Sequence, residues 1–209
     1  MSRGLGDVYK RQDINLEEMK KSLYNNIIDS SENFTPEDTK KLKSYAKAKQ
    51  DAMMQLQAIE VGIDVITGIM EIIASSEIKP DEQLTQNIVE VIPQLLFALL
   101  KEFPARILIT WNNLLWLYVT LGHSAEAELL TKLWNEITAT STTQDDMATK
   151  IGKMSVVWVI LKLCGSLGYI DLLKQWSVWD NPQFITSIKN EYINNDDIEF
   201  RQKCCGVLT

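Results

Sequence analysis

The chain has 209 residues, of which 45% are hydrophobic and 23% charged, and it carries a formal net charge of −7. This composition is ordinary for a globular protein large enough to bury a core. The acidic charge argues against a binder of nucleic-acid backbones and favours a basic protein partner. No apolar run reaches the roughly 18–20 residues of a membrane span; the longest, VVWVILKLCGSLGYI, is interrupted by Lys162 and Gly165.

The first twelve residues, MSRGLGDVYKRQ, are not expected to belong to the fold. The segment DVYKRQ can be written as the codons GAT GTG TAT AAG AGA CAG, which look like a transposon-end sequencing adapter read in frame. The alternative is a genuine N-terminal segment. These residues carry a net charge of +2, so the remainder of the chain carries −9.

The C-terminal stretch DDIEFRQKCCGVLT begins like a helix and stops while still apolar, without a capping residue. We therefore expect residues 13–209 to be a fragment of a single helical-repeat domain that continues beyond this end.

Helical periodicity is nearly continuous between these ends, and strand signals are almost absent. An apolar residue at every third or fourth position predicts a first helix over residues 15–29. The sequence Thr35-Pro36-Glu37-Asp38 predicts the start of a second helix that runs to about Ser75, because it supplies an N-cap, a proline at the first helical position and acids in the first turn. The apolar face of this helix is predicted to be Met53, Leu56, Ile59, Ile63, Ile66, Ile69, Met70 and Ile73.

The remaining helices are predicted over residues 82–102, 105–121, 125–138, 146–167, 169–177 and 182–193, with a last one from about Asp197. The connections are short, so consecutive helices should pack antiparallel. The predicted helix pairs occupy residues 15–75, 82–121, 125–177 and 182–209.

One of these pairs reads VIPQLLFALLKEFPARILITWNNLLWL and contains a proline, Pro93, inside its most apolar helix. A proline there removes a backbone hydrogen bond. The pattern resembles that of HEAT repeats, in which such a proline bends the first helix around its neighbour and the freed carbonyl lies near solvent.

Basic residues and tryptophans recur at a fixed spacing along the chain. Arg106 and Arg201 are 95 residues apart, and Lys153 lies 47 residues after Arg106. Trp111 and Trp158 are also 47 residues apart, each five residues after a basic position. A period of about 40–47 residues is typical of HEAT and armadillo repeats. This resemblance implies a right-handed α-solenoid of antiparallel helix pairs.

Two other architectures fit parts of the sequence. One set of residues falls at tetratricopeptide spacing, although no second copy follows after 34 residues: Trp111, Leu114, Tyr118, Gly122 and Ala127. An unrelated helical bundle is the other alternative. Every one of these interpretations is all-α.

The sequence offers no catalytic constellation and no cofactor or metal motif. The single histidine, His123, follows a glycine in an interhelical turn without a nucleophile motif beside it, and Gly-rich phosphate loops are missing. The carboxylate pairs Asp145-Asp146 and Asp196-Asp197 are interpreted as helix caps. The three cysteines make no CxxC pair and predict buried or helical thiols in a reducing compartment: Cys164, Cys204 and Cys205.

Two groups of residues are candidates for partner binding. Glu60, Asp64 and Glu71 recur along one predicted helix and form an acidic stripe that suits a basic partner, or simply a solvated face. The second group lies on the second helices of predicted pairs, where armadillo proteins present Asn and Trp to an extended peptide: Trp111, Asn112, Asn113 and Trp158. Core packing is the alternative for the tryptophans.

The segments QLQAIEVGIDVITGI and DIEFRQKCCGVL resemble the symportin-type HEAT/armadillo adaptors. That resemblance implies a scaffold that chaperones basic, ribosomal-type proteins into the nucleus. The expected function is therefore non-enzymatic protein binding in the cytoplasm and/or nucleus, with no cofactor, metal, small-molecule substrate, membrane or direct nucleic-acid contact. The alternatives are a structural or regulatory subunit of a larger complex, or a helical enzyme domain.

Overall fold

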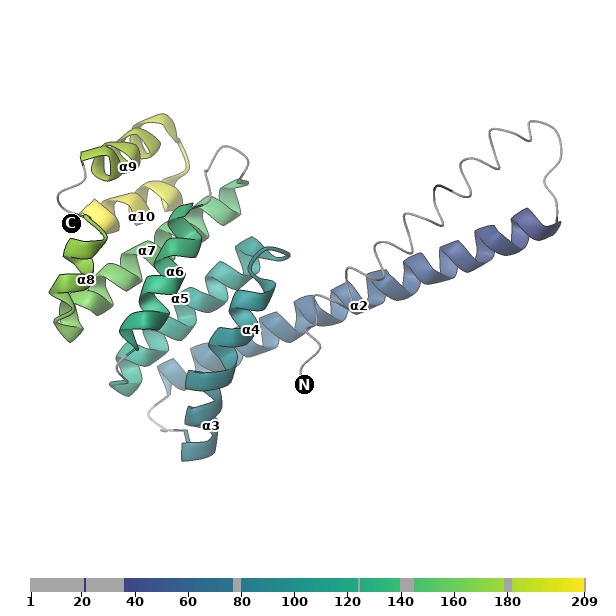
Figure 1. Cartoon of the computed structure of the whole chain (residues 1–209), viewed down its shortest axis with the longest axis horizontal. Coiled ribbons are helices and arrows are strands. Elements are labelled where there is room, and N and C mark those ends of the chain that lie inside the picture. Colours follow the sequence, from purple (N-terminus) through teal and green to yellow (C-terminus); the bar gives the residue numbers. More distant parts are fainter. Residues whose placement is uncertain are drawn as a thin grey trace. The chain divides into compact units, whose positions relative to one another are not determined.

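The computed structural model describes residues 36–76, 80–123, 125–139, 145–178 and 182–208, together with Lys21. Every regular element in these ranges is helical (Figure 1), which confirms the all-α prediction for this part of the chain. The chain divides into two compact units, Met1–Gly62 and Ile63–Thr209. The suspected adapter segment and all but Lys21 of the helix predicted over 15–29 lie outside the described residues. The predicted domain extent, 13–209, stays a prediction.

Helix α2, Pro36–Ser75, has the predicted bounds and the predicted acids in its first turn. Of its predicted apolar face, Ile63 and Met70 are buried. They lie seven residues apart and therefore on one side of the helix. Three other members of that face are exposed: Met53, Leu56 and Ile69.

The second unit is built from pairs of helices. After α2 come α3 (Glu82–Gln86), the π-helical turn η1 (Asn87–Val91), α4 (Ile92–Leu99), α5 (Pro104–Leu121), α6 (Ala127–Ala139), α7 (Met147–Leu167), α8 (Ile170–Gln175), α9 (Pro182–Asn194) and α10 (Ile198–Leu208). Helix α4 packs on α5, α6 on α7, and α9 on α10. The second helices of these pairs also pack on one another, with α7 between α5 and α10 (Figure 1).

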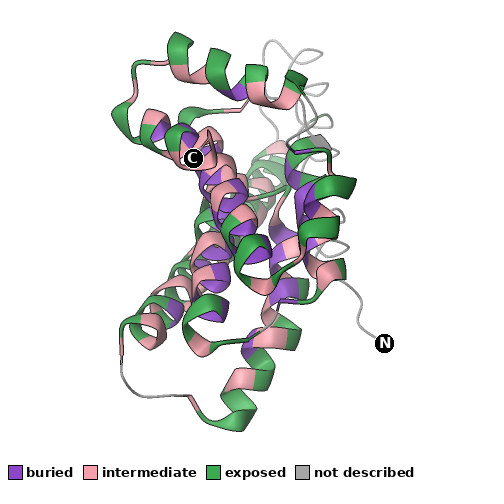
Figure 2. Cartoon of the chain, turned by 90° about the vertical axis from the view of Figure 1, so that its left-hand side faces the viewer, coloured by how far each residue is buried: buried purple, intermediate pink, exposed green. Residues whose placement is uncertain are grey.

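The core of this unit lies mainly around α5 and α7 (Figure 2). Buried residues of α5 are Ile107, Leu108, Thr110, Trp111, Leu114, Leu115, Leu117 and Tyr118. Helix α7 is apolar on several sides because neighbours cover it on more than one side. At Gly152 of α7, an added Cβ would lie 2.8 Å from the Cβ of Leu108, so a glycine permits the close approach of α5 and α7.

The helix ends follow the local signals in the sequence. Gly122 and Gly168 end α5 and α7 in the left-handed conformation, with φ of 67° and 71°, which glycine adopts without strain. The side chain of Asp146 accepts a hydrogen bond from the Thr149 N–H at 2.8 Å, and Asp197 accepts one from Phe200 at 2.8 Å. Both carboxylates therefore cap helices, as predicted.

Pro93 lies at the start of α4, directly after the π-helical turn. The prediction placed its freed carbonyl near solvent, and Val89 is partly exposed beside a surface hollow. A proline at position 93 cannot donate to the carbonyl of Val89, four residues earlier. Instead, the buried Tyr118 of α5 donates its hydroxyl to that oxygen at 3.5 Å. The second helix of the pair thus supplies the donor that the proline removed.

Candidate partner-binding surfaces

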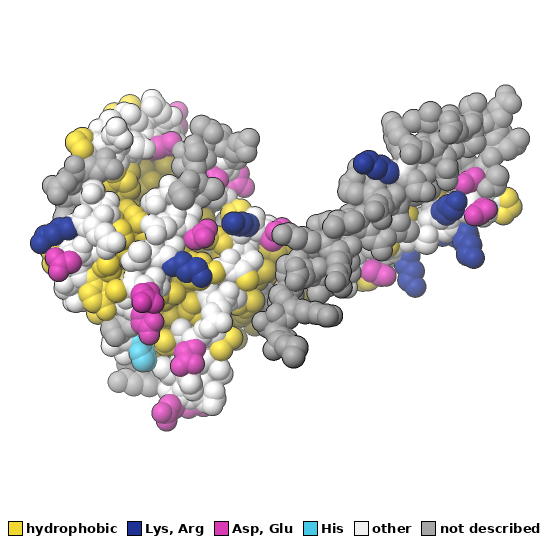
Figure 3. Space-filling model, in the orientation of Figure 1, with side chains coloured by type: hydrophobic (Ala, Val, Ile, Leu, Met, Phe, Trp, Pro, Cys, Tyr) yellow, Lys and Arg dark blue, Asp and Glu magenta, His cyan; other side chains and the backbone are white. Residues whose placement is uncertain are grey.

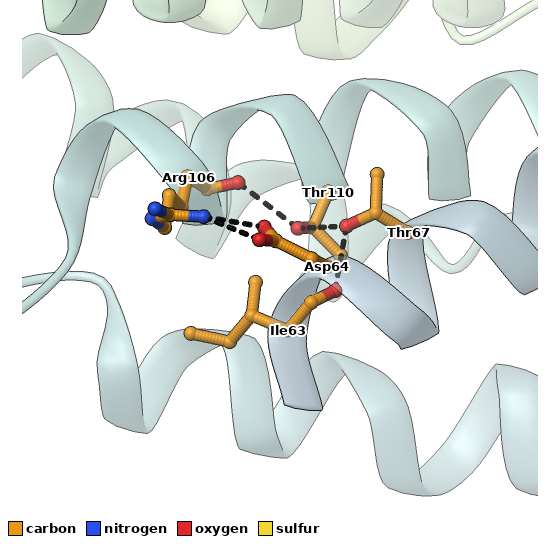
Figure 4. Close-up of polar contacts among 5 residues, drawn as sticks. All are labelled: Ile63, Asp64, Thr67, Arg106 and Thr110. Atoms are coloured by element: carbon orange, nitrogen blue, oxygen red, sulfur yellow. Dashed lines mark hydrogen bonds and ion pairs between the residues drawn. The ribbon is translucent and has the colours of Figure 1, made fainter. Parts of the chain in front are cut away.

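The predicted acidic stripe is divided between the two units, with Glu60 in the first and Asp64 and Glu71 in the second. Asp64 accepts hydrogen bonds from Arg106 of α5 at 2.7 and 2.5 Å (Figure 4). The two side chains are 58% and 43% exposed, so the pair contributes about 0.2–1 kcal/mol to stability. Asp64 therefore helps to hold α2 on α5, whereas Glu71 is exposed.

Beside this ion pair, the hydroxyls of Thr67 and Thr110 lie 2.7 Å apart. Each also contacts the carbonyl four residues before it, Ile63 for Thr67 at 2.8 Å and Arg106 for Thr110 at 2.9 Å. The two hydroxyls have one proton each, so only two of these three contacts can be hydrogen bonds at one time. The pair of threonines nevertheless joins α2 to α5.

The other basic residues of the 47-residue register also bind acceptors close to their own helices. Lys153 of α7 donates to Asp145 at 2.6 Å, with side chains only 12% and 20% exposed. Arg201 of α10 donates to the Tyr192 carbonyl at 3.0 Å and lies over the Tyr192 ring. Arg106 and Arg201 of this register therefore fix one helix to another, and Lys153 fixes the turn before α7 to that helix.

Trp111 is fully buried, and its ring centroid lies 4.9 Å from that of Phe97. Its position favours the core-packing interpretation, because a partner cannot touch it in this fold. Asn112 and Asn113, which follow it on α5, are partly buried. The Asn112 side-chain amide donates to the Asn113 side-chain oxygen at 3.3 Å.

Trp158 belongs to a mixed aromatic and cationic cluster. Its ring meets that of Trp116 edge to face, with centroids 6.4 Å apart. The ammonium of Lys162 lies 5.1 Å from the Trp116 centroid and 6.0 Å from that of Trp158, while Lys203 lies 5.7 Å from Trp158. We call these four residues the Trp–Lys cluster. It draws on α5, α7 and α10.

Of these four residues, only Trp158 was predicted from the sequence as a partner contact. Lys162 follows Trp158 by four residues, a spacing that places both on one helix face, so that contact was accessible to sequence reasoning. Lys203 comes from α10 and had no local signal. Next to the cluster, a hollow of about 340 Å³ opens on the same three helices. It is lined by Ile109, Asn112, Ala148, Ile151, Gly152, Ser155, Glu199 and Lys203.

A second hollow, of about 650 Å³, lies beside the π-helical turn and the α5–α6 connection. Its charged and titratable lining residues are Glu90, Glu126, His123 and Tyr118. Burial, and then the nearby Glu126 carboxylate, raises the pKa of Tyr118 well above its usual value. Figure 3 shows acidic side chains close to the histidine on this face. Such a hollow suits a cationic side chain of a partner.

The described residues also bear on metal binding, membrane spans and the three cysteines. None of them forms a group of three or more His, Cys, Asp or Glu placed to hold a metal ion. No described helix is both long and apolar enough to cross a membrane. Cys164 and Cys204 are buried and Cys205 is exposed, and all three are helical thiols outside any disulfide, as predicted.

Similarity to a known protein adds to this geometry. The chain is similar to Synchronized import protein 1 of Saccharomyces cerevisiae. The two sequences are 38% identical over 181 residues, which cover 81% of this chain and 29% of Synchronized import protein 1. The chain therefore spans less than a third of that relative's length. No protein-family model matches the chain, and no solved structure matches it.

Proposed function

We propose that this chain is part of a non-enzymatic import adaptor that binds a basic protein partner. The observation that carries this proposal is the similarity to Synchronized import protein 1, a protein named for import. The matched segment includes most of the second unit's length, because it covers 81% of the chain. An adaptor of this kind acts in the cytoplasm, the nucleus or both.

We further propose that the helix pairs belong to a right-handed α-solenoid of the HEAT/armadillo type. Three pairs whose second helices pack in a row support this architecture. The register of Arg106, Lys153 and Arg201 supports it too, because each residue lies in the first half of a second helix and binds an acceptor that precedes that helix in the chain. In such repeat arrays a continuous surface of stacked helices is available to bind a partner.

The charge of the chain supports a basic partner, of the kind that ribosomal proteins represent. The net charge is −7, and the hollow beside the π-helical turn brings Glu90 and Glu126 together. Opposite charges steer association and give selectivity more than raw affinity. The predicted contacts Glu60, Asp64 and Glu71 stay part of this proposal, as do Asn112 and Asn113.

Salt-dependent binding tests the proposal. The full chain would be titrated with a panel of basic ribosomal proteins, with lysozyme as an unrelated basic protein and with an acidic protein. We expect selective binding to a member of the ribosomal set that weakens as salt is raised. The double variant Glu90→Gln/Glu126→Gln should lose several-fold affinity, while Glu128→Gln, an equal charge change on exposed α6 surface, should not.

The proposal fails if no basic protein binds at any ionic strength. It also fails if lysozyme binds as well as the ribosomal proteins, since that would indicate non-selective attraction between opposite net charges.

A further inference from the structure

We propose that the Trp–Lys cluster is a second docking surface, which binds an acidic segment of a partner protein. Carboxylates of that segment would pair with Lys162 and Lys203, and its apolar side chains would rest on the indole rings of Trp116 and Trp158. This inference goes beyond the proposed function, which concerns a basic partner.

The two lysines are the first reason. Within the described part of the chain, neither Lys162 nor Lys203 forms an ion pair, although Lys153 and Lys150 on the same row of helices pair with Asp145 and Glu191. An ammonium above an indole ring uses its positive charge but leaves N–H donors for other acceptors. Lys162 is exposed and Lys203 partly so. Their donors can therefore reach a carboxylate from outside.

The rigidity of the aromatic rings is the second reason. A Cβ added at Gly206 of α10 would lie 2.8 Å from the Cε2 atom of Trp158, so the indole rests directly on the backbone of α10. The edge of Trp158 meets Trp116, which is only partly buried. A surface whose side chains are already fixed loses little entropy when a partner binds.

The sign and distribution of charge select the partner. A basic segment would be repelled by two ammonium groups. A nucleic acid requires a stripe of positive charge along its phosphates, whereas this chain is acidic and the cluster supplies two lysines. The adjoining hollow contains one carboxylate among its lining residues, Glu199, which opposes an acidic partner. Removing that charge should therefore strengthen binding.

Fluorescence anisotropy with the full chain tests this surface. The probe is a labelled short peptide in which Glu alternates with Leu; matched peptides carry Gln or Lys in place of Glu, and a short oligouridine represents nucleic acid. We expect the Glu peptide to bind in a salt-sensitive way. The variant Lys162→Gln/Lys203→Gln should weaken its binding about tenfold, and Glu199→Gln should strengthen it about twofold. Lys189→Gln, the same charge change on exposed α9 surface, is the control.

Several results would overturn this inference. One is absence of saturable binding of the Glu peptide. Another is equal affinity for the wild-type chain and the double lysine variant, with circular dichroism showing that both are folded. Stronger binding of the Lys peptide or of oligouridine would assign the surface to another partner. The Glu90 and Glu126 variants that test the basic partner leave these four residues unchanged, so the two proposals can fail separately.

Discussion

Replacing Gly152 by Ala should destabilise the second unit, although alanine is the better helix former. The change gains about 1 kcal/mol in helix propensity. Against this, the new Cβ would lie 2.8 Å from the Leu108 Cβ, well inside the ~3.5–4.0 Å at which carbon atoms pack best. Because the Leu108 Cβ is attached directly to the backbone of α5, only a separation of α5 and α7 relieves the contact.

Overpacking of this kind costs roughly 1–3 kcal/mol. The atom that must move is not the tip of a flexible side chain, so we expect the upper half of that range and a net loss of about 1–2 kcal/mol. For a domain of this size each kcal/mol lowers the melting temperature by about 2–4 °C. Urea and thermal unfolding, followed by circular dichroism, measure the change.

The matched control is Gly165→Ala in the same helix. A Cβ at Gly165 has no heavy atom within 4 Å, so this variant should raise stability by about 0.4–1 kcal/mol. The two glycine variants are therefore expected to change stability in opposite directions. If both raise the melting temperature by similar amounts, α5 and α7 do not approach as closely as described, and the reasoning is refuted.

Three further predictions concern buried and exposed polar groups. The ion pair of Lys153 and Asp145 should show a coupling of about 1–3 kcal/mol in a double-mutant cycle, above the ~0.2–1 kcal/mol of exposed pairs, because both side chains are largely buried; a coupling near zero would contradict this. Ellman's reagent should modify one thiol quickly in the native protein, that of Cys205, and Cys164 only on unfolding; fast modification in the Cys205→Ser variant would contradict this. Burial raises the pKa of Cys164 to about 11, so the thiol stays protonated in the folded state after it has ionised in the unfolded chain. The contribution of this thiol to the free energy of unfolding is complete below the pKa of the unfolded chain, about 8.5. It is lost as the pH rises towards 11, by at most about 1.4 kcal/mol per pH unit. The Cys164→Ala variant should show a shallower fall of unfolding free energy over this range, and an unchanged slope would contradict the assignment.

Helix bounds were predictable because their signals are local. Pro36, Gly122 and Gly168 act through their own backbone conformation, and the acids after Pro36 act on the dipole of the first turn. The predicted and observed bounds of the described helices therefore differ by only a few residues, apart from the π-helical turn that divides the predicted helix 82–102.

The environment of individual side chains depends on distant neighbours, and the sequence could not supply it. Trp111 and Trp158 occupy the same position in the 47-residue register. Trp111 is buried against Phe97, whereas Trp158 packs on Gly206 and is partly exposed. The 47-residue period identified equivalent positions in successive helix pairs, but it did not show which side chains pack on each of them. For the same reason, the sequence did not show that Asp64, a predicted partner contact, also binds Arg106 of α5.

The most direct test of the adaptor proposal is an exchange of segments. The part of Synchronized import protein 1 that matches this chain would be deleted, or replaced by the chain, in Saccharomyces cerevisiae. Quantitative mass spectrometry would then compare the proteins that co-purify with each version. We predict that the deletion loses a basic protein partner and that the replacement recovers it. The proposal is contradicted if the deletion loses no partner, or if the replacement loses the same partners as the deletion.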